Sequence, residues 1–350
     1  MIKVALMEQR VTMQRIADEA GVSRMTVSCA LRNSPKVSKA TCRRIQALAL
    51  ALGYKPDPLI QRLNTHLAQA HRQSSGQVIA WINSFKERKP WGGQIPFFSM
   101  YEGAAARARK LGFQLEEFWL REPDMTGEKL SRILYQRGIE CLILAPIPKG
   151  GGHLTMDWDK FSAVAIGYAM VFPRMHRVGT HHHHSAHEAF RQLYRKGHRR
   201  IGLFLSKDMN SRTDHGWLEA MAYHQFNIPK KYWVTPLIQD DYSEKLFLRW
   251  FKKERPDSIL THYWWLDELL VKEGYRVPED VAIAFFDLEG ASPRMAGIDE
   301  RYGLIGEKAA DLVIAQYYRN EKGIPAEPDT VMIEGRWVDG STVCRKALKV

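Results

Sequence analysis

The sequence has few cysteines and no long hydrophobic run. Among its 350 residues there are four cysteines, none in paired or metal-ligand spacing: Cys29, Cys42, Cys141 and Cys344. This pattern argues against a disulfide framework or a zinc ribbon and is typical of a reducing compartment. No stretch approaches the roughly 18 apolar residues of a membrane-spanning helix, and the first ten residues lack the apolar core of a signal peptide. We therefore expect a cytoplasmic protein with no membrane partner.

Acidic residues are scarce at the N-terminal end. Residues 1–72 contain 12 Lys and Arg against 4 Asp and Glu, so most of the formal net charge of +12 lies in this segment. Such an asymmetry is expected of a nucleic-acid-binding module, although a solvated basic arm would show it as well. The pattern of helix-forming and helix-ending residues in the same segment separates these two interpretations.

The basic segment contains start and stop signals for three short helices. Thr12, Ser23 and Ser38 are good N-caps, and Gly21 and Gly53 are suited to the turns that follow a helix. The expected helices begin at Met13, Arg24 and Lys39, and the last two end at about Leu31 and Leu52. Three short helices with a small-residue turn after the first predict a helix-turn-helix domain, whose second helix enters the major groove of DNA.

The same segment resembles a known family. The run V-T-M-Q-R-I-A-D-E-A-G-V-S-R-M-T-V-S-C-A-L, followed by V-S-K-A-T and L-G-Y-K-P, is similar without gaps, from Val11 to Pro56, to the headpiece of the LacI/GalR (lactose-repressor) regulators. The resemblance implies an all-α DNA-binding headpiece over residues 1–57. It also implies a sequence-specific transcriptional repressor that is not an enzyme and needs no cofactor.

The resemblance assigns DNA contacts position by position. Arg24 and Met25 occupy the two main base-reading positions, where Arg24 can donate two hydrogen bonds to guanine and Met25 can contact only shape or a thymine methyl. Cys29 stands where the family usually has Arg, so we expect a divergent operator. The other expected contacts to phosphates and bases are Thr12, Ser23, Thr26, Ser28, Ser38, Thr41 and Tyr54.

Residues 58–76 match the hinge helix and linker of these regulators. Leu63 aligns with a leucine that enters the minor groove, where apolar wedges unstack a base step. The alternative is that Leu59, Leu63 and Leu67 form one face of an ordinary helix. Ile60 replaces the usual Ala, and the segment is several residues longer than usual.

Residues 77–350 alternate between strand and helix patterns. Expected strands are 78–82, 114–119, 141–145, 163–166, 201–205, 258–260 and 281–285, and expected helices are 100–111, 127–137, 187–196, 215–224, 242–254 and 266–273. This order predicts an α/β core of two doubly wound lobes with parallel sheets, and ligands of such folds bind at the carboxyl ends of the strands. The landmarks R-G-I-E-C-L-I-L-A-P, G-H-R-R-I-G and V-P-E-D-V-A-I-A-F-F-D resemble the family's effector core, which is periplasmic-binding-protein-like.

The resemblance also indicates effector residues in the cleft between the lobes. Asp287 matches the family's ligand-binding aspartate, and Arg212 resembles its ligand-clamping arginine, although Thr213 is an alternative because the spacing is one residue shorter. The family's Asn-Asp pair is replaced by T-H-Y-W-W-L-D, which places His262 and Trp264 near the cleft. Phe98 and His182 are the remaining candidates. Aromatic rings stack on sugar faces, so we expect a carbohydrate effector; a nucleobase or a phosphorylated effector is the alternative.

Two further expectations concern metals and assembly. The run His181–His184, with His187, suggests a metal site, but consecutive side chains diverge and no carboxylate or cysteine clusters beside them in the sequence, so we expect no metal. A metal-dependent hydrolase that uses this run and Asp214 is a weaker alternative without a supporting catalytic motif. One headpiece reads too few base pairs for useful specificity, so we expect a homodimer on palindromic double-stranded operator DNA.

Overall fold

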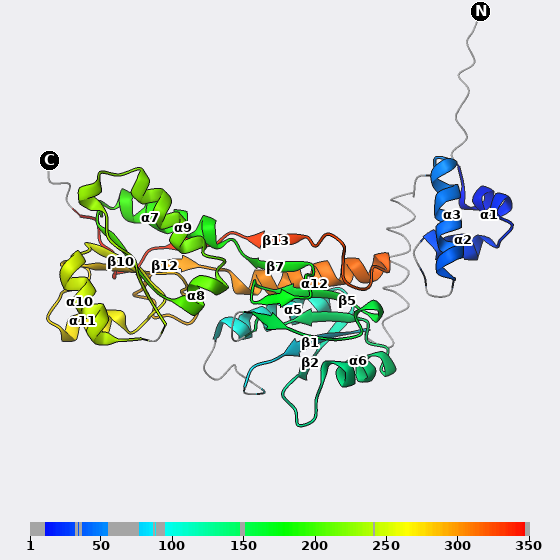
Figure 1. Cartoon of the computed structure of the whole chain (residues 1–350), viewed down its shortest axis with the longest axis horizontal. Coiled ribbons are helices and arrows are strands. Elements are labelled where there is room, and N and C mark those ends of the chain that lie inside the picture. Colours follow the sequence, from blue (N-terminus) through cyan, green and yellow to red (C-terminus); the bar gives the residue numbers. More distant parts are fainter. Residues whose placement is uncertain are drawn as a thin grey trace, which may run out of the picture.

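The computed structural model describes residues 11–31, 34, 37–54, 77–86, 88, 95–147, 151–240 and 242–346. These residues form a three-helix headpiece and two α/β lobes, and the lobes lie side by side along the horizontal axis of Figure 1. The predicted hinge, including Leu63, lies outside the described residues. Among the described residues, no helix combines the length and apolar composition needed to cross a membrane.

The headpiece consists of α1 (Met13–Ala20), α2 (Arg24–Leu31) and α3 (Lys39–Ala51). These helices confirm the predicted helix-turn-helix order. Gly21 ends α1 with a φ of 67°, a left-handed conformation that favours glycine. Ile16, Val27 and Ile45 are fully buried, one from each helix, and form the centre of a small apolar core.

The first lobe is a six-stranded parallel sheet in the order β13-β7-β5-β3-β1-β2. Its core strands are buried on both faces, which is why they are continuous apolar runs in the sequence. Helices α5 (Ile95–Lys110) and α12 (Tyr302–Arg319) pack against one core, and α6 (Gly127–Gln136) packs against the other. The strands are β1 (Gln77–Asn83), β2 (Phe113–Trp119), β3 (Cys141–Leu144), β5 (Ser162–Ile166), β7 (Arg177–Thr180) and β13 (Thr330–Ile333). The short strands β4 (Gly152–His153) and β6 (Met170–Phe172) pair separately.

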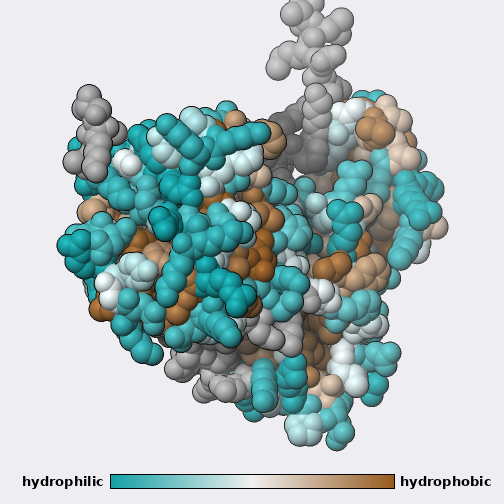
Figure 2. All heavy atoms as spheres, turned by 60° about the vertical axis from the view of Figure 1, so that its left-hand side comes forward, coloured by the Kyte–Doolittle hydropathy of each residue, from teal (hydrophilic) through white to brown (hydrophobic). Residues whose placement is uncertain are grey.

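The second lobe has a six-stranded sheet in the order β14-β12-β11-β10-β8-β9, in which only the β14–β12 pairing is antiparallel. The strands are β8 (Ile201–Ser206), β9 (Leu237–Gln239), β10 (Ser258–Thr261), β11 (Ala282–Phe285), β12 (Ala296–Asp299) and β14 (Arg336–Val338). The helices are α7 (His182–Arg195), α8 (Lys207–Arg212), α9 (Gly216–Phe226), α10 (Glu244–Glu254) and α11 (Leu266–Lys272). Hydrophilic residues cover most of the face in Figure 2, with hydrophobic patches between them.

Three chain segments cross between the lobes. They run from β7 to α7 at His181, from β12 to α12 at Glu300, and from β13 to β14 at Gly335. The His181 N–H donates to the Ile333 carbonyl at 2.8 Å, and the Ser185 hydroxyl donates to the Glu300 carboxyl at 3.2 Å. A Cβ on Gly335 would lie 2.6 Å from the Ser185 hydroxyl oxygen, so this crossing has room only for glycine. The three crossings therefore pack directly against one another.

The structure corrects several predicted elements. Helix α7 starts at His182, five residues before the predicted start, because small and polar residues such as Ser185 and Ala186 face the core and give no apolar signal. The strands β4, β6, β7, β9, β12, β13 and β14 and the helices α8 and α12 were not predicted. Trp81 and Trp217 are buried, and Trp217 stacks on Phe286 with ring centroids 3.7 Å apart.

Close packing of α5 against α12 gives a prediction about Gly306. A Cβ there would lie 1.9 Å from the Met100 carbonyl oxygen, so Gly306→Ala must push the helices apart and should cost about 3 kcal/mol, lowering Tm by several degrees. At Gly303, in the same helix, the nearest atom would be 3.8 Å away. Gly303→Ala should therefore be neutral or should stabilise by about 0.5–1 kcal/mol. Equal Tm values for the two variants would contradict this account.

Candidate functional sites: a helical DNA-binding surface and an interlobe cleft

All three headpiece helices start with a hydroxyl-bearing cap. The hydroxyls of Thr12, Ser23 and Ser38 accept hydrogen bonds from backbone N–H groups of the first turn, at 3.3, 3.1 and 3.2 Å. None of the three first turns contains an acidic residue. The partial positive charge at each helix N-terminus is therefore left for an external anion, such as a DNA phosphate.

Two of these caps carry a second hydroxyl. Ser23 lies 2.9 Å from Thr26, and Ser38 lies 2.8 Å from Thr41, measured between hydroxyl oxygens. Paired hydroxyls at a helix start are suited to positioning a phosphate group, which fixes the orientation of a protein on the duplex.

The first turn of α2 presents the two predicted base-reading residues. Arg24 is exposed, and Met25 is 72% exposed although it is a large apolar side chain. Ser28 is half-buried further along α2, and Tyr54 is half-buried against the headpiece core. The structure thus places Arg24 and Met25 outward from a helix whose other face is packed.

Side chains of α3 hold the angle between the headpiece helices. The Arg44 guanidinium donates to the Ala20 carbonyl at 3.2 Å, and the Gln46 amide donates to the Ala30 carbonyl at 3.0 Å. These bonds satisfy carbonyls at the ends of α1 and α2 that have no partner within their own helix. The orientation of α2 is therefore set by hydrogen bonds as well as by packing.

In the core, Asp287 follows β11 at the carboxyl end of the second sheet. Its carboxylate accepts hydrogen bonds from the Glu289 N–H at 2.9 Å and from the Tyr302 hydroxyl at 3.0 Å. Its backbone carbonyl accepts from the Trp264 indole at 3.1 Å. Burial raises the pKa of Asp287 to about 7, against the opposing effect of the two hydrogen bonds.

Glu300 and His182 lie beside this group at the crossings. Glu300 is 2% exposed, and burial raises its pKa well above the ordinary range, with a further contribution from the Asp287 charge. The His182 ring nitrogen Nδ1 is 3.9 Å from the Glu300 carboxyl, too long for a hydrogen bond. Burial lowers the pKa of His182 to about 3, so the ring is neutral at pH 7.

Arg212 approaches the same cluster from the end of α8. Its charge is the second cause, after burial, of the lowered pKa values of His182 and His262, which fall to about 3 and about 4. Its nearest ion-pair partner, Asp208, is 3.8 Å away. The Arg212 charge therefore acts on two rings that are neutral at pH 7, and its ion pair with Asp208 is long.

The first lobe reaches this cluster through the start of α5. Phe98 is 42% exposed there, and the hydroxyl of the next residue, Ser99, donates a short hydrogen bond to the Glu289 carboxyl of the second lobe. The structure thus brings His182, Arg212, His262, Trp264 and Asp287 together and places Phe98 on the facing lobe. Sequence reasoning missed Tyr302 and Glu300; the only signal was the polar D-E-R-Y run between an apolar strand and an apolar helix.

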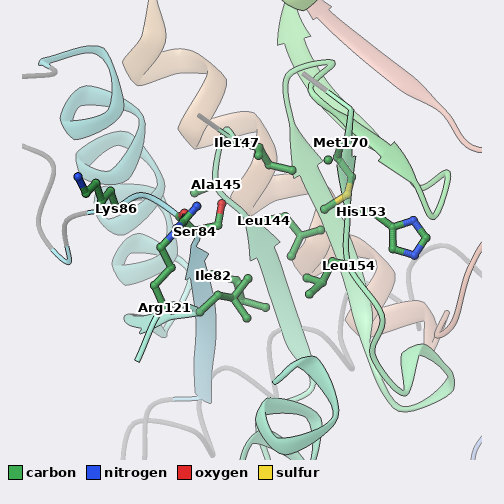
Figure 3. Close-up of a pocket in the computed structure, with 12 residues that line it drawn as sticks. Ile82, Ser84, Lys86, Arg121, Leu144, Ala145, Ile147, His153, Leu154 and Met170 are labelled. Carbon is green, nitrogen blue, oxygen red and sulfur yellow. The ribbon is translucent and has the colours of Figure 1, made fainter. Parts of the chain in front are cut away.

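Two of the cavities in the core bear on this site. Figure 3 shows an apolar pocket of about 460 Å³ in the first lobe, where Ile82, Leu144 and Leu154 form the wall and Lys86 and Arg121 come from the other side. A polar cavity of about 400 Å³ is lined by residues of both lobes, including Arg212. Asp287, Glu300 and Tyr302 line neither of these cavities.

The histidine run forms a chain of ring contacts. The His187 ring lies 3.2 Å from His183 and 3.2 Å from His224, but through different ring nitrogens. The described residues contain no group of three or more ligand side chains that could hold a metal ion.

Comparison with known proteins identifies both parts of the chain. Residues 12–57 match the family described as bacterial regulatory proteins, lacI family, and residues 190–343 match the periplasmic binding protein-like domain. The NTD biosynthesis operon regulator NtdR of Bacillus subtilis (strain 168) is 23% identical over 334 residues, which cover 87% of this chain and 92% of that protein.

Solved structures share the fold. The complex of the transcriptional regulator CelR with cellobiose superposes with a TM-score of 0.55 at 20% identity and covers 95% of this chain and all of that one. The Lac repressor dimer bound to operator and the anti-inducer ONPF gives a TM-score of 0.55 at 17% identity, over 96% of this chain and all of that one. The predicted fold class, a helical headpiece followed by a two-lobed core, is confirmed.

The raised pKa of Asp287 predicts a pH-dependent stability. Between about pH 4 and 7 the native state keeps Asp287 protonated, whereas the unfolded chain has lost this proton. The contribution of the protonated Asp287 to folding stability is therefore complete below pH 3.8 and is lost as the pH rises to about 7. Asp287→Asn cannot ionise, so its Tm relative to the parent should be higher at pH 8 than at pH 5. Asp280→Asn is the control, because Arg276 lowers the pKa of that exposed carboxyl to about 2. Parallel pH profiles for Asp287→Asn and the parent would contradict the assignment.

Proposed function

This chain belongs to the lacI family of bacterial regulatory proteins, and we propose that it acts as a homodimer whose affinity for a palindromic operator is controlled by a sugar in the interlobe cleft. The observation that carries the proposal is that one chain has both sites. The start of α2 exposes Arg24 and Met25, and the core has a cluster of polar residues around Asp287. The protein would act in the cytoplasm, where operator DNA is available.

DNA reading in this proposal divides between two kinds of contact. The capped starts of α1, α2 and α3 hold phosphates through Thr12, the Ser23–Thr26 pair and the Ser38–Thr41 pair. Arg24 reads a guanine through two hydrogen bonds, and Met25 contacts a thymine methyl. Leu63 stays the proposed minor-groove wedge.

The cleft chemistry favours a polyhydroxylated effector. The Nδ1 atoms of His182 and His262 are buried without a hydrogen-bond partner among the described residues. Buried polar atoms of this kind are normally satisfied, so a ligand that supplies several hydroxyls would complete the site. Asp287 can accept hydrogen bonds from such hydroxyls, and the half-buried Trp264 provides an aromatic edge. That CelR is seen with cellobiose is consistent with this class of effector.

The crossings explain how a ligand bound between the lobes would change the affinity for DNA. Asp287 bonds to Tyr302 at the first residue of α12, immediately after the Glu300 crossing. An effector that binds Asp287 and Phe98 at once favours one angle between the lobes, and this angle sets the spacing of the first lobes in a dimer. The spacing then permits or prevents folding of residues 58–76 on DNA.

A ligand screen tests the effector assignment. The full chain should show a Tm increase of several degrees with one or more mono- or disaccharides at concentrations about 100-fold above Kd. His262→Ala should abolish that shift without changing operator binding in the absence of ligand, whereas His153→Ala, in the apolar pocket of the first lobe, should leave it intact. A response to nucleobases alone would contradict the sugar assignment.

Binding-site selection tests the role of α2. Arg24→Ala should relax the preference at one position of each half-site and reduce affinity by about 1–3 kcal/mol. Arg15→Ala removes another exposed guanidinium, from α1, where it pairs with Glu19, and should leave the selected sequence unchanged. An unaltered sequence profile for Arg24→Ala would refute base reading by this residue.

A further inference from the structure

The polar cavity between the lobes has an unusual set of charges. The first lobe contributes Tyr168, Arg174 and Arg177, and the second contributes Arg212, Asp214 and His215. Three guanidinium groups thus line a space of about 400 Å³ together with one carboxylate. Like charges brought together from two lobes are unfavourable unless an anion lies between them.

The arginines of this cavity are poorly neutralised. Arg212 has an ion-pair partner, Asp208, at 3.8 Å, and the Arg177 guanidinium donates a hydrogen bond to the Met170 carbonyl at 3.4 Å. The ion pairs among the described residues include neither Arg174 nor Arg177. The Arg177 guanidinium lies over the Tyr168 ring, 5.7 Å from its centre. Arginine forks bind phosphate and carboxylate through two parallel hydrogen bonds, so such preorganised groups favour an oxyanion.

Asp214 is the group that opposes an anion here. Asp214 and His215 have φ values of 50° and 61°, both in the left-handed region, and Ser211 and Asn210 carbonyls accept hydrogen bonds from their N–H groups. The turn therefore holds Asp214 in place at the cavity. The Asp214 charge also affects the first lobe. Burial is the main cause of the raised pKa of Tyr168, and the Asp214 charge is the second cause.

We propose that this cavity is a second ligand site, distinct from the cleft at Asp287, that binds a phosphate group through Arg174, Arg177 and Arg212. Because the three arginines come from both lobes, a bound phosphate bridges the lobes and favours one arrangement of them. Arg212 belongs to both sites, so phosphate and the cleft effector affect each other's affinity. The inference extends the proposed function but does not require that the effector be a sugar.

Phosphate titration of the full chain tests the site. Binding of inorganic phosphate, measured by calorimetry against chloride at equal ionic strength, should weaken at least about tenfold in Arg174→Gln, the loss of one charge-assisted pair. Arg174 is exposed and has no structural partner among the described residues, so this variant should fold normally. Phosphate binding that is unchanged in Arg174→Gln would overturn the proposal.

A gain of affinity provides an independent test. Asp214→Asn removes the opposing charge and keeps a residue type that tolerates positive φ, so phosphate should bind several-fold more tightly. Asp124→Asn is the matched control, since Asp124 is exposed with a φ of 60° and does not line the cavity. Equal affinities in these two variants would contradict the site.

Two more comparisons define the ligand and separate this site from the cleft. If a hexose phosphate binds more tightly than inorganic phosphate, the ligand is a phosphorylated metabolite; the reverse order indicates free phosphate. Weaker binding of both ligands to Arg174→Gln supports the site. Asp287→Asn should lose the cleft effector and retain phosphate within about twofold. If Asp287→Asn abolishes phosphate binding, the cavity is not a separate site and the proposal fails. If no sugar binds but phosphate behaves as stated, only the proposed effector class is wrong.

Discussion

The meeting of three crossing segments is the constraint on which the core depends. Each lobe is completed by chain that has passed through the other, so the crossings have to pack together and satisfy their polar groups mutually. They do so through the hydrogen bonds from Ser185 to Glu300 and from the His181 backbone to Ile333, and through the Arg336–Asp299 ion pair at 2.8 Å. A buried carboxyl at this junction is costly when ionised, which is why burial raises the pKa of Glu300.

The proposed effector site adjoins this junction. Glu300, His182 and Tyr302 belong to the crossings or follow them directly, and Asp287 is bonded to Tyr302. A ligand that contacts these residues therefore acts on the segments that set the angle between the lobes. Ligand binding can therefore affect the angle between the lobes directly, because the proposed binding residues and the crossing segments are neighbours.

The headpiece and the core use positive potential in different ways. In the headpiece, helix ends without acidic residues and with hydroxyl caps leave backbone charge available for phosphates spaced along DNA. In the core, the cavity beside Arg212 concentrates side-chain charge in a confined space, which suits one small anion.

The sequence by itself determined the headpiece helices and seven of the core strands, because N-caps, glycine turns and apolar runs are local signals. The helix starts predicted from Thr12, Ser23 and Ser38 depend on residues close in the chain. So do the predicted strands β1, β2, β3, β5, β8, β10 and β11. Only the tertiary structure decided the rest. Helix α7 starts early because Ser185 faces a crossing. Glu300, Tyr302 and Arg174 acquire their roles from neighbours 15 or more residues away in the chain. Burial and charge convergence are properties of packed segments, and no local pattern encodes them.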